Sequence, residues 1–505
     1  MKWDAVIVGS GFGGAMAAHR LVGAGARVLM IERGDWVERG PAAWRPEASL
    51  ELTPSYAMDI PYRCERGGHG SVIGGYACVG GPSVYYGCVS FRFREQDFVG
   101  DPDIVANSGA AWPFTYDELE PYYCEAEGLL GIAGDDAGDP TAPRRSQPFP
   151  HAPGALAPIS QRVVETAVEM GLSPFHLPLA INHAGANGRN ACVACRTCDT
   201  YACAIGAKND IATMMIEPLA ARGMTLWPNT VALRLEAKGD RIGHLHVYRR
   251  DTGEHVAIEA DTFVLAAGAL GTPHLLLASA LERPGVGRYL MRHANAMVFG
   301  VFPLRPDPAR RFHKQIALHD WYFGDPSADD GLHKLGGVQQ MMTPPKELVR
   351  AHLPRGTKTL VGAFTEQLTG LLCIAEDQPR ETNGVAVDWN VRDMYGLPQL
   401  VIDHVYSQRD EAAVAALVGR ARALLTRMGA LLAYTHRVKT FSHAIGTVRM
   451  GTDAARAPLD AHCRYRGLAN LWVTDASALP MSAGVNPSLT IAANALRAAD
   501  AMLAS

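Results

Sequence analysis

The feature that most constrains the fold is a glycine-rich turn between a short apolar run and a helical segment at the start of the chain. Residues 4–8 form the apolar run, and Gly9-Ser-Gly11-Phe-Gly13-Gly14 follows directly. Residues 15–21 have the composition of a helix, and residues 28–31 predict a second strand that ends at Glu32. Strand, glycine turn, helix, strand and acid, in this order, indicate a dinucleotide-binding βαβ unit.

Each residue of this turn has a physical reason to be there. Gly9 permits a tight turn, Gly11 lets the backbone approach a pyrophosphate, and Gly14 lets the helix pack against the strand. The N-terminus of the helix offers unpaired N–H groups and the positive end of its dipole to the phosphates. Glu32 can accept hydrogen bonds from a ribose 2′-OH and disfavours a 2′-phosphate. We therefore expect a bound dinucleotide that lacks a 2′-phosphate.

Length and charge set broad limits on the class of protein. A chain of 505 residues exceeds one simple core, which predicts two domains. The net charge of −4 gives no reason to expect a nucleic acid or an anionic membrane surface as a partner. No apolar run reaches the roughly 18 residues that a membrane span needs. Since the first strand is predicted to begin at residue 4, we expect no secretory or twin-arginine signal. We expect a cytoplasmic protein, with export beside a signal-bearing partner as the alternative.

The remaining elements alternate between strand and helix patterns. Residues 224–267 alternate between apolar and polar side chains, which predicts strands, and the run that ends at Gly268 is typical of a buried parallel strand. A turn then leads into a helix expected to begin at His274. Apolar residues at helical spacing predict further helices over 159–171, 411–432 and 489–503. Residues 134–158 are rich in Pro, Gly, Ala and Asp, which predicts a loop.

Motifs distributed over nearly the whole chain resemble those of the glucose–methanol–choline (GMC) flavoprotein oxidoreductases. These motifs are Gly80-Gly81-Pro-Ser83…Gly87…Arg92, Gly268-Ala-x-x-Thr272-Pro273, Ser442-His443-Ala-Ile-Gly446-Thr447-Val-Arg449-Met450-Gly451, Asp475-Ala-Ser477 and Asn486-Pro487-Ser-Leu489-Thr490. The resemblance implies an α/β fold in which a Rossmann-like FAD-binding domain is interleaved with an α+β substrate domain built on an antiparallel sheet. The implied FAD-binding domain comprises residues 1–105, 206–297 and 440–505. The implied substrate domain comprises residues 106–205 and 298–439 and includes a cysteine-rich segment, 192–203.

The resemblance also implies FAD as the cofactor and assigns residues to it. The expected FAD contacts are Gly9, Gly11, Phe12, Gly13, Gly14, Glu32, Arg33, Gly80, Gly81, Ser83, Tyr86, Gly87, Val231, Ala267, Gly268, Asp475, Ala476, Asn486, Pro487 and Ser488. His69 lies in the glycine-rich stretch where some relatives attach FAD covalently. Because no convincing attachment motif surrounds His69, we expect non-covalent binding.

Two residues are expected to carry the chemistry. Oxidation of an alcohol by a flavin needs a base that takes the hydroxyl proton while the carbinol C–H delivers hydride to flavin N5. Histidine suits the base because its pKa lies near neutrality. The resemblance gives this role to His443 and gives Asn486 the role of holding the alcohol oxygen. Nothing in the sequence spacing shows that the two side chains meet.

Four cysteines lie close together in the sequence as Cys192-x2-Cys195-x2-Cys198-x4-Cys203. The first interpretation is a set of thiols, or local disulfides, that pack a loop. The second is an iron–sulfur cluster, although the last gap is longer than in ferredoxins and no proline follows Cys203. The third is zinc. A cluster would favour a dehydrogenase that passes electrons to an external acceptor. Without one, oxygen, a quinone or a protein carrier could each reoxidise the flavin.

The expected substrate domain mixes aromatic rings with hydrogen-bonding side chains, which favours a polyol substrate. Candidate substrate residues are His313, Gln315 and Gln340. We expect oxidation of a primary or secondary hydroxyl of a sugar, glycoside or aminocyclitol-like compound. One alternative is an oxidase for a hydrophobic alcohol such as a sterol, whose site would be nearly all apolar. Another is a redox-neutral flavoprotein of the same family.

Overall fold

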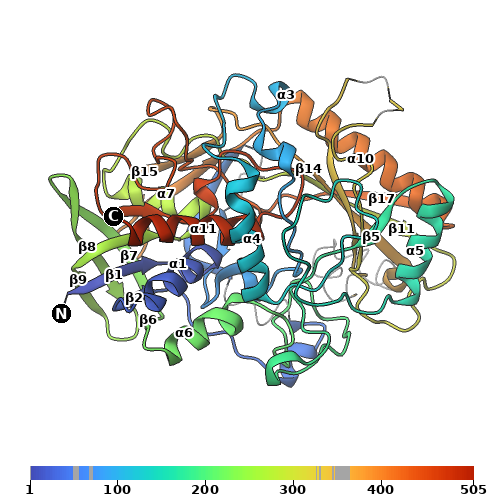
Figure 1. The fold of residues 1–505 in the computed structure, drawn as a ribbon, viewed down its shortest axis with the longest axis horizontal. Helices are drawn as coiled ribbons and strands as arrows, with labels where there is room; N and C mark the ends of the chain where they lie inside the picture. Colours follow the sequence, from blue (N-terminus) through green and yellow to red (C-terminus); the bar gives the residue numbers. More distant parts are fainter. Residues whose placement is uncertain are drawn as a thin grey trace.

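Two sheets at opposite ends of the molecule organise the chain (Figure 1). The computed structural model describes residues 2–48, 56–66, 72–325, 327–328, 331–343, 346 and 364–505. One sheet is parallel and is flanked by α1 and α11, and the other is antiparallel and is covered by α5 and α10. This combination confirms the predicted fold class.

The parallel sheet is assembled from three distant parts of the sequence. Its strand order is β18-β10-β1-β2-β6. The strands are β1 (Trp3–Val8), β2 (Val28–Ile31), β6 (Thr225–Trp227), β10 (Ala260–Leu265) and β18 (Leu471–Val473). Helices α1 (Phe12–Gly23) and α11 (Ser488–Leu503) pack against each other beside this sheet. Strands β2 and β18 are wholly buried, as expected where layers cover both faces of a parallel sheet.

The antiparallel sheet has the strand order β17-β11-β14-β13-β12-β5. Its strands are β5 (Pro174–His176), β11 (Ala294–Val301), β12 (Ile316–Leu318), β13 (Gly336–Met341), β14 (Leu368–Ala375) and β17 (Leu432–Arg437). Helices α5 (Pro158–Glu169) and α10 (Gln408–Arg427) pack on this sheet and share a second hydrophobic core with it. The division into two domains and their boundaries stay a prediction.

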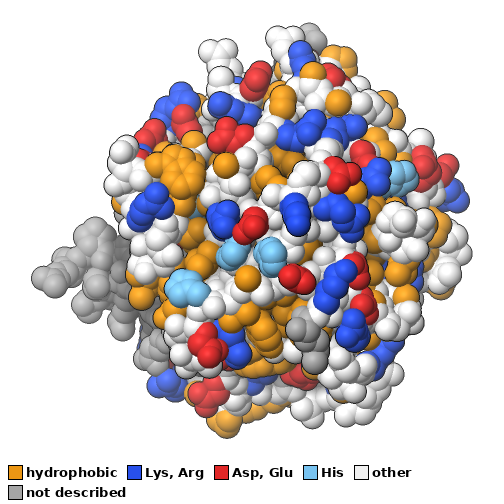
Figure 2. All heavy atoms as spheres, turned by 90° about the vertical axis from the view of Figure 1, so that its left-hand side faces the viewer, with side chains coloured by type: hydrophobic (Ala, Val, Ile, Leu, Met, Phe, Trp, Pro, Cys, Tyr) orange, Lys and Arg blue, Asp and Glu red, His pale blue; other side chains and the backbone are white. Residues whose placement is uncertain are grey.

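Two smaller sheets complete the strand pairing. In the first, β15 (Gly384–Arg392) pairs with β16 (Pro398–Asp403), which runs parallel to β3 (Tyr56–Arg66), and β3 pairs with β4 (Val72–Tyr76). The second is a meander of β7 (Thr230–Lys238), β8 (Arg241–Arg249) and β9 (Glu254–Ile258). Figure 2 shows the face of the molecule at the end that holds β7, β8 and β9 (left in Figure 1), where basic and acidic side chains are interspersed. Within the described residues, no helix is long and apolar enough to cross a membrane.

Most predicted helices lie where the apolar spacing placed them, with α5, α10 and α11 beginning within three residues of the expected position. Helix α7 (Gly268–Ala278) begins six residues earlier than expected. Its first turn is stable there because Asp475 accepts from the Gly268 N–H and the Thr272 hydroxyl accepts from the Ala267 N–H. The described residues also form the helices α3 (Pro102–Val105), α4 (Tyr116–Leu130) and α6 (Glu217–Ala221), with a π-helical turn at Ala212–Ile216. Single 3₁₀ turns lie at Pro41–Trp44, Gly81–Val84, Glu95–Phe98, Ala186–Gly188, Thr365–Gln367 and Ala476–Ala478.

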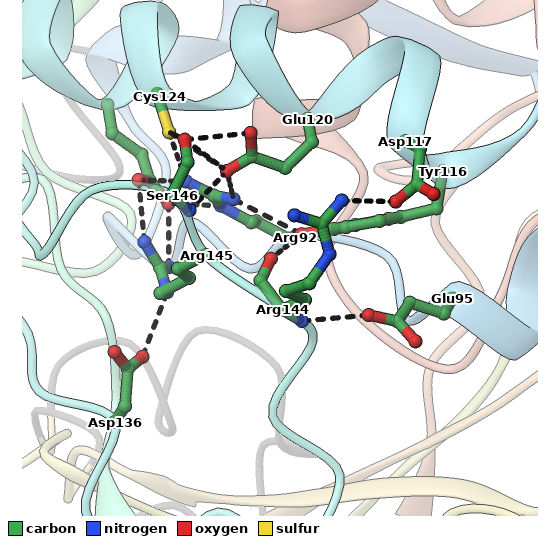
Figure 3. A network of polar contacts seen from close by, with 11 residues as sticks. Arg92, Glu95, Tyr116, Asp117, Glu120, Cys124, Asp136, Arg144, Arg145 and Ser146 are labelled. Atoms are coloured by element: carbon green, nitrogen blue, oxygen red, sulfur yellow. Dashed lines mark hydrogen bonds and ion pairs between the residues drawn. The ribbon is translucent and has the colours of Figure 1, made fainter.

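A buried ion network joins α4 to the loop over residues 134–158 (Figure 3). Arg92 is completely buried and donates to Glu127, at 2.9 and 2.7 Å, and to Glu120, at 3.0 Å. Arg145 comes from the loop and donates to both oxygens of the same Glu127 carboxylate, at 2.7 Å each. Of the loop predicted over residues 134–158, residues 134–157 contain neither a helix nor a named strand, and Pro158 begins α5. The network fixes this loop against α4.

Candidate active site

The glycine turn after β1 lets three strand ends approach one another closely. A Cβ at Gly9 would overlap the Ala266 carbonyl after β10, and a Cβ at Gly13 would overlap the Thr474 carbonyl after β18. A Cβ at Gly11, by contrast, would enter open space. Gly11 is also the N-cap of α1 and provides no side-chain cap, which leaves the N–H groups of the first turn available. The turn therefore fits a pyrophosphate, which approaches at Gly11 and interacts with the N-terminus of α1.

Glu32 is held in place at the carboxyl end of β2. Its Oε2 accepts from the N–H and the hydroxyl of Ser10, at 3.1 and 2.7 Å, and its Oε1 accepts from the N–H of Gly34, at 3.1 Å. A carboxylate oxygen has more than one acceptor site, so Glu32 can still accept from a ribose hydroxyl. Arg33, also expected to contact FAD, follows Glu32 directly. His69 lies outside the described residues.

The second glycine-rich loop packs directly on the first. Gly80 donates its N–H to the Ser10 hydroxyl, at 3.0 Å, and a Cβ at Gly81 would lie 3.3 Å from the Cα of Gly11. The hydroxyl of Ser83 donates to the Gly80 carbonyl, at 2.7 Å, and accepts from the N–H of Ile211, at 2.9 Å, so it stabilises the loop itself. The rings of Phe12 and Tyr86 meet edge to face, with centroids 5.7 Å apart. Val231, by contrast, is buried in a small separate cluster.

A third group of expected FAD residues gathers at the start of two helices. Asp475 accepts from the N–H and hydroxyl of Ser477 and from the N–H of Gly268, which follows Ala267. Ala476 accepts from the Gly446 N–H. A Cβ at Gly268 would enter open space, as at Gly11.

Pro487 is the N-cap of α11 and provides no side-chain cap, and the Ser488 hydroxyl donates to the Val89 carbonyl. The donors and open positions around these residues therefore fit FAD, which would lie between β1, α7 and the start of α11.

The structure brings His443 and Asn486 together. Asn486 Nδ2 lies 3.5 Å from His443 Nε2, and Asn486 Oδ1 accepts from Nε2 of Gln339, at 2.7 Å. The bond from Gln339 orients the Asn486 amide, so its NH₂ group points toward His443. Gln339 is buried, and its own Oε1 has no partner among the described residues. An alcohol at this position would meet an imidazole nitrogen, an amide donor and an unsatisfied amide acceptor.

Strand pairing explains why these side chains meet. Strands β11 and β17 are antiparallel neighbours, so His293, which precedes β11, lies at the same sheet edge as the segment that leaves β17 toward His443. Strand β14 is antiparallel to β11 and ends at this edge, where Asp377 follows it. Nδ1 of His293 lies 3.0 Å from Nδ1 of His443.

The electrostatic environment keeps His443 neutral. Burial, together with the neighbouring His293 and Lys314, lowers the pKa of His443 to about 3. Lys314 is itself paired with Asp199, at 2.7 Å. A Cβ at Gly87 would overlap the Lys314 ammonium, which places this ion pair against the loop expected to contact FAD. A neutral imidazole is the form that can accept a proton from an alcohol.

The three residues predicted to bind substrate form a different, buried cluster. Gln315 Oε1 accepts from the Ala157 N–H, and the Ser160 hydroxyl lies 2.9 Å from Gln315 Oε1 and 3.0 Å from Gln340 Oε1, so its one hydrogen is shared between them. His313 is buried and contacts the Arg311 carbonyl and the Thr343 N–H. No hydrogen bond in the described part of the chain joins any of the three to His443 or Asn486. Gln339 makes that contact instead, because adjacent residues of a strand point to opposite faces.

The four clustered cysteines do not form a metal site in this structure. Among the described residues, no group of three or more His, Cys, Asp or Glu side chains is placed to hold a metal ion, and none of the ten cysteines forms a disulfide. Each thiol has its own surroundings. Cys192 accepts from the Ala194 N–H, and burial raises its pKa to about 11. Cys195 contacts Thr197. Cys198 accepts a hydrogen bond from Cys88, which lowers the Cys198 pKa to about 7. As placed in the structure, Cys192, Cys195, Cys198 and Cys203 thus do not converge on a point that zinc or an iron–sulfur cluster could occupy.

His293, Gln339 and Lys314 lie at the site but were not assigned to it from the sequence. His293 lies 150 residues from His443, and no sequence motif that we identified links them. Gln339 and Gln340 are chemically identical neighbours, so only the strand's orientation distinguishes them. Lys314 lies between two residues that were singled out, His313 and Gln315.

Comparison with known proteins agrees with this geometry. Two family models described as GMC oxidoreductase match residues 77–295 and 379–495. The chain is 32% identical to 6'''-hydroxyparomomycin C oxidase of Streptomyces lividus, an alignment that covers 99% of this chain and 91% of the relative. It is 31% identical to paromamine 6'-oxidase of Streptomyces fradiae, with the same coverage. The structure of pyridoxine 4-oxidase from Mesorbium loti superposes with a TM-score of 0.69 at 21% identity and covers all of both chains. The chain therefore belongs to the GMC oxidoreductase family and is an FAD-dependent alcohol oxidoreductase.

Proposed function

We propose that this enzyme oxidises a hydroxyl-bearing carbon of a sugar, glycoside or aminocyclitol-like compound. When bound, FAD supplies the hydride acceptor. His443 Nε2 takes the hydroxyl proton, and Asn486 Nδ2 donates to the alcohol oxygen and orients it. The observation that carries this proposal is the 3.5 Å approach of Asn486 Nδ2 to His443 Nε2.

The groups around this pair support a polyol over a sterol. The unsatisfied Oε1 of buried Gln339 would accept from a second hydroxyl of the substrate, and an unmet buried acceptor disfavours an apolar ligand. The Lys314–Asp199 pair adds further charge beside Gly87. Similarity to two enzymes named for the oxidation of paromamine and a hydroxyparomomycin supports a substrate that contains an amino sugar.

The test is the anaerobic reduction of the holoenzyme by a panel of alcohols. The reduction is measured as the loss of flavin absorbance. The panel contains paromamine, a methyl glycoside, a free sugar and cholesterol. We expect reduction by the sugar-containing members and about a 10²–10⁴-fold slower rate in His443→Ala, as for removal of a general base. The control is His436→Ala, because His436 is an exposed histidine of β17. The flavin of this variant should be reduced at the wild-type rate. Reduction by cholesterol alone would favour the hydrophobic-alcohol alternative. Reduction by no member would favour a redox-neutral flavoprotein.

We further propose that FAD is bound non-covalently, that Cys192, Cys195, Cys198 and Cys203 remain thiols, and that the protein is cytoplasmic. Acid precipitation should release the flavin into the supernatant, and metal analysis of anaerobically purified protein should find neither iron nor zinc in stoichiometric amount. The electron acceptor is best identified by comparing oxygen uptake with the reduction of a quinone analogue.

A further inference from the structure

A second imidazole, His293, contacts the candidate base through the nitrogen that does not face Asn486. His293 is buried, and both of its ring nitrogens have partners. Its Nε2 lies 3.0 Å from the backbone carbonyl of Ser482, and its Nδ1 lies 3.0 Å from Nδ1 of His443. The two rings are perpendicular, with centroids 5.1 Å apart.

These contacts determine which nitrogens carry hydrogen. A carbonyl oxygen only accepts, so Nε2 of His293 must be the donor in its bond to Ser482. A neutral imidazole has one N–H, so Nδ1 of His293 then carries a lone pair and can only accept. The hydrogen bond between the two Nδ1 atoms therefore requires His443 to donate from Nδ1. The lone pair of His443 is left on Nε2, which faces Asn486.

We propose that His293 is a positioning residue that selects the tautomer of His443 in which Nε2 is free to take the substrate's proton. This inference rests on the proposed role of His443 as the base. A protonated or reoriented His293 would donate from Nδ1 instead, which would place the His443 hydrogen on Nε2 and block proton acceptance.

The surroundings hold His293 in this arrangement. The Asp377 carboxylate accepts from the backbone N–H of His293, at 3.1 Å, and from the Ser482 hydroxyl, at 3.0 Å. Asp377 thereby fixes both His293 and the residue whose carbonyl accepts from its ring. The hydroxyl of Tyr406 donates to the His293 carbonyl, at 2.7 Å. His293 has a φ of 60°, a left-handed conformation that is uncommon for a residue other than glycine and that these contacts maintain.

Burial favours the neutral forms of both rings and outweighs the Asp377 carboxylate, which favours their charged forms. The Asp377 carboxylate contacts His293 through Oδ1, and its other oxygen, Oδ2, lies 3.4 Å from Nε2 of His404. Burial lowers the pKa of His293, against the opposing effect of Asp377. Lys314 and His293 disfavour a charge on His443. The tautomer selection therefore operates in the neutral state of the pair.

The test compares His293→Leu, which removes both ring nitrogens, with His293→Gln, whose amide can accept from His443 and donate to Ser482. In the holoenzyme, His293→Leu should reduce its flavin about 10²-fold more slowly at saturating substrate. His293→Gln should recover most of that loss, and KM should change little in either variant. The matched control is His274→Leu, which removes another buried histidine whose Nε2 bonds to a backbone carbonyl. This control should keep the wild-type rate and FAD content.

A second readout is independent of turnover. Ring-nitrogen NMR of the ¹⁵N-histidine-labelled holoenzyme, with His443→Ala to assign the signals, reports which nitrogen of His443 is protonated. We expect a protonated Nδ1 and a bare Nε2 in the wild type, and a mixture of tautomers in His293→Leu. A protonated Nε2 in the wild type, or a His293→Leu variant unchanged in ring signals and rate, would overturn the proposal. Correct ring signals without alcohol oxidation would refute the proposed function alone.

Discussion

Replacing Glu127 by glutamine would test whether the buried ion network of Figure 3 is as important to the fold as its geometry implies. Both oxygens of the Glu127 carboxylate accept from two guanidinium groups, those of Arg92 and Arg145. The side chains of Arg92, Glu127 and Arg145 are 0%, 1% and 8% exposed, so water cannot replace a lost partner. A glutamine would place an NH₂ group opposite guanidinium N–H donors of Arg92 and Arg145, so donor would face donor.

The magnitude follows from the number of bonds lost. Glutamine keeps one acceptor oxygen and so loses two of the four bonds to Glu127, each worth about 1.5–3 kcal/mol when a charged group takes part. Breaking a buried ion pair by removal of one partner costs about 3–5 kcal/mol, because it leaves uncompensated charge. We therefore expect Glu127→Gln to lower the free energy of unfolding by about 3–5 kcal/mol.

The assay is urea unfolding of the holoenzyme, followed by tryptophan fluorescence at a fixed excess of FAD. The matched control is Glu118→Gln on the same helix, where the exposed carboxylate accepts from the Thr115 N–H in a capping box that glutamine also satisfies. The control should change stability by less than about 0.5 kcal/mol. If the two variants unfold at the same urea concentration, the network does not stabilise the fold as argued.

Three further predictions concern the site. Gln339→Leu should raise KM for a polyol about tenfold, the effect of one lost hydrogen bond, whereas Gln340→Leu should leave KM unchanged; equal effects in steady-state assays would contradict the assignment of the two strand faces. Because the pKa of His443 is lowered to about 3, its neutral form persists above that value, so the rate of flavin reduction should stay level from about pH 8 to pH 5 and fall only toward pH 3. An acid limb near the ordinary pKa of histidine would refute this. Gly11→Val should fold, since Gly11 has a φ of −74° and open space at its Cβ, yet lose FAD, measured as the ratio of flavin to protein absorbance beside an unchanged circular dichroism spectrum.

The parts of the fold that the sequence predicted are those governed by local patterns. The first βαβ unit could be recognised because glycines stand where strand ends crowd together, as the Cβ positions at Gly9 and Gly13 confirm. Helix α4 was missed although a local signal existed. Thr115 and Glu118 form a capping box, and apolar residues follow at helical spacing at Leu119, Tyr123 and Leu130.

The missed parts of the site depend on pairing between distant strands. Gln339 and Gln340 are adjacent in β13, so their side chains lie on opposite faces of the sheet. The alternation alone does not show which of the two faces His443 and Asn486, because that depends on how the neighbouring strands pair. His293 and His443 approach because β11 pairs with β17, and this pairing spans about 140 residues of sequence. The motif around His443 indicated a base, but the group that fixes its tautomer could only be found from the sheet.

One short segment connects the two halves of the site. Residues 482–486 lead into α11 and are hydrogen-bonded to the edge of the antiparallel sheet. Ser482 donates to Asp377, Ala483 donates to Glu376, Gly484 accepts from Gly337, and Asn486 accepts from Gln339. The same segment supplies the carbonyl that orients His293 and ends in Asn486, directly before the helix N-terminus assigned to FAD. A displacement of this segment would therefore disturb the tautomer of the base, the amide that holds the alcohol and the cofactor contacts together. Substitutions that weaken its attachment to Asp377 or Glu376 should lower the rate of flavin reduction more than they lower the affinity for substrate, since orientation of the base is lost before the binding groups are.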